Sequence, residues 1–168
     1  MTYITSSALN DTAINLDSLT VLSNSTTDFS ISVGTVMGLG EEDQLYGSAT
    51  YSVSSGVITL SSGYYYLLKG VLSGTVPAGE VTSAYTSYQF YDTGASSYVG
   101  RRGWLIWQES PKLNGGDEYA IALIDASSSA QTIDLRVLSV SSANIDCDPT
   151  GSQSNYVGLS RVEVYKWS

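Results

Sequence analysis

The chemistry open to this chain is limited first by its complete lack of histidine. Without histidine there is no Ser-His-Asp or Cys-His nucleophile system, no His-ligated zinc and no general base that ordinarily titrates near neutral pH. The single cysteine, Cys147, excludes an intramolecular disulfide. It lies between Asp146 and Asp148, whose negative charges disfavour a reactive thiolate. We therefore expect Cys147 to be an inert thiol in a loop.

Carboxylates are the remaining catalytic candidates, because a pair of them can hydrolyse a glycosidic bond. Acids beside Gly and Asn are more often solvated residues that form turns, and we favour that interpretation. Asp146 and Asp148 could also bind calcium through their oxygens, but no EF-hand spacing is present and we expect a polar loop there. We expect no enzyme activity, cofactor or metal. The candidate carboxylates are Glu41, Glu42, Asp43, Glu109, Asp117, Glu118 and Asp125.

A second group of side chains could bind a partner. Tyr98, Arg101, Arg102 and Trp104 lie in or beside one Gly/Ser-rich stretch. The guanidinium of Arg grips carboxylates as a planar fork, and Tyr and Trp are typical of sugar-binding and interface surfaces. Two interpretations stay open: Tyr98, Arg101 and Arg102 contact a carboxylate or another acid of a partner, or the arginines are solvated and Trp104 belongs to the core.

The elements that position these residues are short and extended. The chain has 168 residues, with 13 Tyr, 16 Gly and only 14% charged residues. Few charged residues leave few exposed helix positions, and no segment keeps a helical period for three turns. About eight to ten alternating segments separated by turn signals predict an all-β fold, an antiparallel two-sheet jelly-roll sandwich. We expect an N-terminal arm and first strands over residues 1–44, and the jelly-roll domain over residues 45–168.

One strand carries apolar residues on both of its faces. Between Ser61 and Ser73, one face carries large side chains from Tyr64 to Leu72, and the other is apolar at Tyr65, Leu67 and Val71. The inner face of a sandwich meets the opposite sheet, so the outer face needs another cover. We expect that cover to be another subunit, the alternative being a loop of the same chain.

The charge distribution bears on the partners. The net charge is −9, and the first Lys or Arg in the chain is Lys69. Such a chain does not neutralise phosphates, so we expect no nucleic-acid partner. An acidic N-terminal third would suit a basic partner, with ordinary solubility as the alternative. We expect no signal peptide, because no basic region precedes a long apolar run, and no membrane partner.

Three short pieces resemble C1q/TNF-like jelly-roll domains. Residues 57–66 resemble the family's short strand, glycine turn and aromatic-rich strand; residues 116–119 look like its Gly-Asp turn; residues 159–166 are similar to the last strand of such domains in phage virion proteins. The resemblance implies a tight homotrimer formed through aromatic residues of the inner sheet. The interface residues that it implies here are Tyr64, Tyr66, Leu68, Trp104 and Trp107.

In phage particles, similar domains occur as capsid decoration proteins, head fibres and tail-fibre tips. The resemblance therefore implies a trimeric decoration (cement) protein on the capsid surface of a tailed phage, assembled in the host cytoplasm and bound to the major capsid protein or another virion protein. We expect a capsid position rather than a fibre, because no repetitive shaft precedes the domain. The alternatives are a receptor-binding head-fibre or tail-fibre tip that binds a host surface glycan or protein, and a glycosidase. Residues 1–44 are the expected shell-attachment region.

Overall fold

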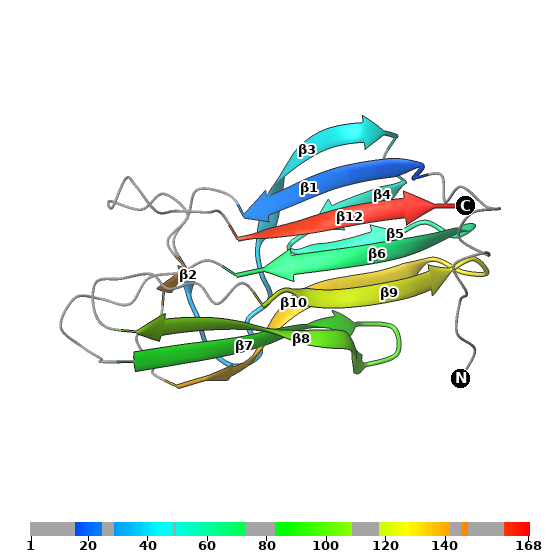
Figure 1. Ribbon diagram of the computed structural model, residues 1–168. Coiled ribbons are helices and arrows are strands. Elements are labelled where there is room, and N and C mark those ends of the chain that lie inside the picture. Colours follow the sequence, from blue (N-terminus) through cyan, green and yellow to red (C-terminus); the bar gives the residue numbers. More distant parts are fainter. Residues whose placement is uncertain are drawn as a thin grey trace, which may run out of the picture.

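The computed structural model describes residues 16–24, 29–48, 50–72, 83–108, 118–141, 146–147 and 160–168. This part of the chain is all-β, which confirms the all-β part of the prediction (Figure 1). Within it, no helix is long and apolar enough to cross a membrane. The strands are β1 (Ser18–Asn24), β2 (Phe29–Ser30), β3 (Leu39–Gly47), β4 (Tyr51–Ser54), β5 (Val57–Leu60), β6 (Tyr64–Val71), β7 (Ser83–Asp92), β8 (Ser97–Gln108), β9 (Ala120–Ala126), β10 (Gln131–Val140), β11 (Asp146–Cys147) and β12 (Arg161–Trp167).

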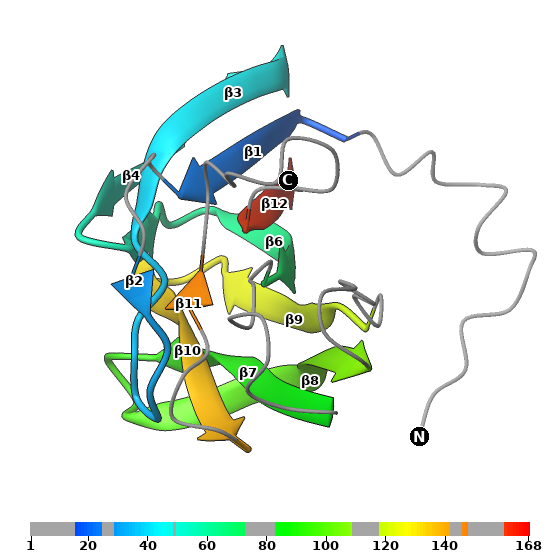
Figure 2. The same cartoon turned by 90° about the vertical axis from the view of Figure 1, so that its left-hand side faces the viewer.

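Ten of these strands form one sheet that curls back on itself, in the order β3-β1-β12-β6-β9-β8-β7-β10-β5-β4 (Figure 2). We call β3-β1-β12-β6-β9 the first half and β8-β7-β10-β5-β4 the second half. In the described chain, the halves are joined through Arg101 opposite Ile121 and through a bridge between Trp104 and Glu118. The expected two sheets are thus two halves of one sheet. The short strands β2 and β11 pair separately.

Within the ten-stranded sheet, four antiparallel pairs are nested inside one another along the sequence, and the separate β2–β11 pair lies between the outermost two of them. The four pairs are β7–β8, β6–β9, β5–β10 and β1–β12, from the innermost pair to the outermost. This is the connectivity of a long hairpin that has been rolled up. The partners of the outer pairs are far apart in sequence, so their pairing depends on the whole roll and not on local turns.

The core lies between the inner faces of the two halves. Strand alternation turns every second side chain inward. On β6 the inward residues include Tyr66 and Leu68, and on β7 they include Tyr88 and Phe90, all of them fully buried. The Tyr66 hydroxyl lies 3.0 Å from Thr50 Oγ1 and 3.1 Å from the Thr50 carbonyl oxygen, so its polar end is satisfied inside the core.

A glycine makes the corner between the halves possible. A Cβ at Gly103 on β8 would lie 2.4 Å from Tyr88 Cε2, 2.6 Å from the Ala120 nitrogen and 2.7 Å from the Glu118 carbonyl oxygen. Two of these atoms are backbone atoms beside or in β9 and cannot move aside independently. Only glycine therefore lets β8 approach β9 closely enough for the sheet to turn.

We predict that Gly103→Ala destabilises the fold by about 1–3 kcal/mol, because the added methyl pushes β8 away from β9. Gly38→Ala is the matched control, since a Cβ there meets nothing within 4 Å. Urea unfolding of both variants measures the difference. Equal midpoints for the two variants would show that the corner does not need a glycine.

Candidate interaction surface

The residues expected at a subunit interface are distributed over the molecule. Tyr66 and Leu68 are fully buried inside the chain, so they leave no exposed surface for a partner subunit. Tyr64 is half-buried, with its ring 6.3 Å from that of Tyr66. Trp104 is half-buried on β8 in the second half. The side chain of Trp107 lies outside the described residues.

An apolar line crosses the outer face of the first half from strand to strand. Backbone pairing sets one residue of each strand opposite its neighbour on β3, β1, β12, β6 and β9. Leu123 and Tyr46, at the two ends of the line, are 68% and 59% exposed. The three residues between them are half-buried, so the row forms an apolar strip that is most exposed at its two ends, which makes it a candidate interaction surface. This outer apolar row consists of Tyr46, Leu19, Tyr165, Leu67 and Leu123.

A polar cluster lies beside the outer apolar row. Lys69 Nζ is 3.1 Å from Glu163 Oε2, and the Tyr165 hydroxyl donates to the same oxygen over 2.8 Å. Arg161 Nε is 3.5 Å from Glu163 Oε1. Lys69 Nζ also lies 4.7 Å from the centre of the Tyr119 ring. Glu163 is therefore held from both of its oxygens, on the same face as the row.

The contacts within this polar cluster shift the pKa values of Glu163, Lys69 and Tyr165. Burial by itself would raise the pKa of Glu163, but hydrogen bonds from Tyr165 and Lys69, together with the charges of Lys69 and Arg161, leave the pKa lowered. The hydrogen bond to Glu163 raises the pKa of Lys69, despite the opposing effect of burial. Burial and then the hydrogen bond to Glu163 raise the pKa of Tyr165. The charged forms of Glu163 and Lys69 thus stabilise each other.

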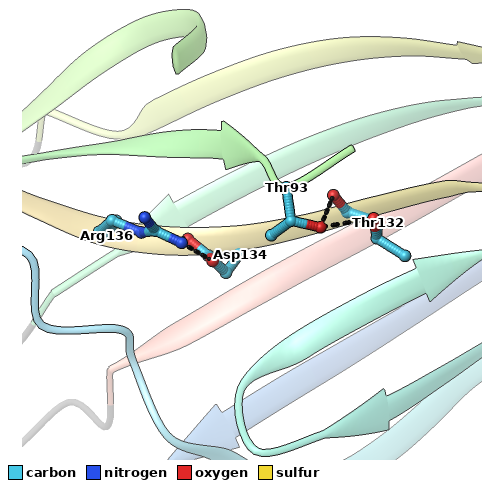
Figure 3. Close-up of polar contacts among 4 residues, drawn as sticks. All are labelled: Thr93, Thr132, Asp134 and Arg136. Carbon is cyan, nitrogen blue, oxygen red and sulfur yellow. Dashed lines mark hydrogen bonds and ion pairs between the residues drawn. The ribbon is translucent and has the colours of Figure 1, made fainter. Parts of the chain in front are cut away.

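The second half carries a different outer face, on which aromatic and charged side chains lie together. Arg136 Nε donates to Asp134 Oδ1 over 3.0 Å, and a second guanidinium nitrogen donates to Asp134 Oδ2 (Figure 3). The guanidinium carbon lies 3.8 Å from the centre of the Tyr91 ring. Tyr91 meets Tyr98 edge to face, with ring centres 5.0 Å apart. The hydrogen bond to Asp134 raises the pKa of Arg136.

The three residues expected to contact a partner are not brought together. Tyr98 packs on Tyr91, whereas Arg102 lies 5.8 Å from the centre of the Trp104 ring. Arg101 pairs with Glu118 over 3.5 Å, and both side chains are more than half exposed. Successive residues of a strand point to opposite faces, which separates Arg101 from Arg102. The sequence interpretation missed Arg136 and Asp134, although their alternation with Ile133 and Leu135 is a signal of an outward face.

The carboxylate candidates do not form a catalytic pair in the described part of the chain. Glu118 is engaged with Arg101, and the Asp125 carboxylate accepts hydrogen bonds from Ser127, which lower its pKa. No group of three or more acidic or cysteine side chains is placed there to hold a metal ion. Outside the described residues lie Glu109, Asp117 and Asp148, and the side chains of Glu41, Glu42, Asp43, Asp146 and Cys147.

Comparison with protein families and with curated proteins identifies no relative of this chain. No protein-family model matches the chain, and no curated protein matches it in sequence.

We predict that Glu163→Gln costs about 1 kcal/mol of stability at pH 7 and less as the pH falls. The pKa of Glu163 is lowered by folding, so its charge contributes fully above the unfolded value, near 4.5, and the contribution is lost as the pH drops through the folded value. Unfolding curves of both proteins between pH 7 and pH 3 measure this convergence.

Glu118→Gln is the control, because the exposed pair of Glu118 with Arg101 should matter little at any pH. A gap between wild type and Glu163→Gln that stays constant or widens on acidification contradicts the assignment.

Proposed function

We propose that this chain is a non-enzymatic structural protein of a tailed-phage particle, a trimeric jelly roll that decorates and stabilises the capsid surface. In this role the protein acts through contacts with its neighbours in the particle and catalyses no reaction. Its partners are two further copies of itself and the major capsid protein or another virion protein.

The strand connectivity supports the jelly-roll assignment. A jelly roll is a long antiparallel hairpin rolled into two facing layers. The nesting of β7–β8 within β6–β9, β5–β10 and β1–β12 has this form. In this roll β5 leads through the turn at Gly63 into β6, and β6 pairs with β12.

The outer apolar row carries the proposal of a trimer. In a single chain it leaves Leu123 and Tyr46 in water, together with Tyr65 on the same face of β6, although β6 and β9 bury most of their other faces. Covering the row with the same face of other copies would remove this surface from water, at roughly 25 cal/mol per Å². The proposed contact residues are therefore Tyr65, Leu67, Leu123 and Tyr165. Tyr66 and Leu68 support this face from beneath, in the core.

The attachment to the shell is assigned to the N-terminal strands. Strand β1 lies between β12 and β3 in the first half, so residues 18–24 are part of the sheet and not a separate arm. Strand β3 is the terminal strand of the ten-stranded sheet, and it carries Glu41, Glu42 and Asp43. A basic patch on a shell protein would complement these charges.

We predict that the protein sediments at micromolar concentration with about three times the 17.9 kDa mass of one chain, and that Leu123→Asp sediments as a monomer. Burying an unpaired carboxylate in the interface is too costly to be tolerated. Val33→Asp is the matched control, because Val33 is 67% exposed in a turn outside the row. A monomeric wild type, or a Leu123→Asp trimer, contradicts the proposed interface.

We predict that replacing Glu41, Glu42 and Asp43 together by Lys leaves a folded trimer that no longer binds particles lacking this protein. The reversed charges would repel a basic shell surface. Co-sedimentation with such particles measures binding, and sedimentation of the free variant checks the trimer. A trimeric variant that binds as well as wild type would move the attachment site away from β3.

A further inference from the structure

We infer that the outer face of the second half binds a neutral hexose ring of a polysaccharide. The site consists of Tyr91, Tyr98, Thr132, Asp134 and Arg136, which we call the tyrosine–arginine cluster. It does not depend on the trimer or on the capsid location.

The strand register brings the cluster together. Thr132, Asp134 and Arg136 alternate along β10 with core residues, so all three face outward. Backbone pairing sets Asp134 opposite Tyr91, and Tyr91 opposite Tyr98. Thr132 is joined to Thr93, the residue that follows β7: the Thr93 hydroxyl oxygen lies 3.1 Å from the Thr132 carbonyl oxygen and 2.5 Å from the Thr132 hydroxyl oxygen (Figure 3).

The cluster is held in place before any ligand arrives. Asp134 is only 1% exposed and holds the Arg136 guanidinium by two hydrogen bonds. The guanidinium lies against the Tyr91 ring, and the Tyr91 and Tyr98 rings pack edge to face. Tyr98 is nevertheless 42% exposed. A large aromatic surface is thus presented to water in a fixed orientation, which lowers the entropic cost of binding.

These groups match the chemistry of a pyranose ring. A sugar offers an apolar C–H face that stacks on an aromatic ring and a rim of hydroxyls that need hydrogen-bond partners. Tyr98 supplies the ring. Within the described residues, Asp134 occupies two of the five guanidinium donors of Arg136, so others are left for sugar hydroxyls. Asp134 also neutralises Arg136, which favours a neutral sugar over an acidic one.

The location suits a surface receptor site. In the proposed trimer, the outer faces of β12, β6 and β9 in the first half are covered by other copies, and the tyrosine–arginine cluster lies on the other half of the curled sheet (Figure 2). Each subunit would then present one weak site, and several sites acting together would bind a repeating polysaccharide with higher avidity.

The test is saturation-transfer difference NMR of the full chain with the methyl glycosides of glucose, galactose, mannose and N-acetylglucosamine. We expect transfer to the ring C–H protons of at least one of these sugars, and about five- to tenfold weaker binding for Tyr98→Ala. Arg136→Lys should also weaken binding, because lysine keeps the charge but loses the planar fork.

Tyr85→Ala is the matched control. Tyr85 is 46% exposed and packs on Trp104, away from the cluster. We expect it to bind as wild type does. The inference is overturned if no sugar receives saturation from the folded wild type, if only acidic sugars added as a comparison do, or if Tyr98→Ala binds as well as the wild type does. Sedimentation tests the trimer independently of sugar binding. A monomeric protein that binds sugar would therefore contradict the proposed trimer and leave the proposed sugar site standing.

Discussion

The structure depends on the close approach of β8 to β9 at the corner where the sheet turns. Gly103 leaves room there for the Tyr88 ring and for the backbone of residues 118–120. Because the sheet turns at this point, the inner faces of its halves meet, and Tyr66, Tyr88 and Phe90 form a closed core. The nested strand pairs follow from the same roll. A flat sheet of ten strands would leave both faces in water and would have no core to stabilise it.

Curling the sheet buries the inner faces of its two halves against each other. It leaves two outer faces that differ in character. The first half is apolar outside along the outer apolar row, with the Lys69–Glu163 pair beside it. The second half is polar and aromatic outside, around Tyr91 and Arg136. In the proposal made above, the two faces have different roles: β12, β6 and β9 of the first half contact other copies of the chain, and the second half faces a ligand. Neither role needs a nucleophile or a general base, which agrees with a chain that lacks histidine.

The sequence predicts which segments form strands better than it predicts which face of each strand points into the core. Alternation and turn residues identify the strands, and the apolar residues on both sides of β6 predict that its outer face meets a partner. Which face is inner could not be read from the residues. On β9 the small Ala120 and Ala122 point inward, because the large Tyr66 and Leu68 of the neighbouring β6 help to fill the core, while the larger Leu123 points outward. The tyrosine–arginine cluster depends on the register of β10 against β7, which is a long-range property.

The most direct test of the central claim is the solvent accessibility of the Leu123 side chain in the intact protein. Hydroxyl-radical footprinting read by mass spectrometry compares it with Val33, which has the same exposure in a single chain. The account predicts that Leu123 is protected at micromolar concentration and becomes reactive on dilution, while Val33 reacts throughout. Equal oxidation of Leu123 and Val33 at every concentration would show that the outer apolar row stays in water, and would contradict the proposed trimer.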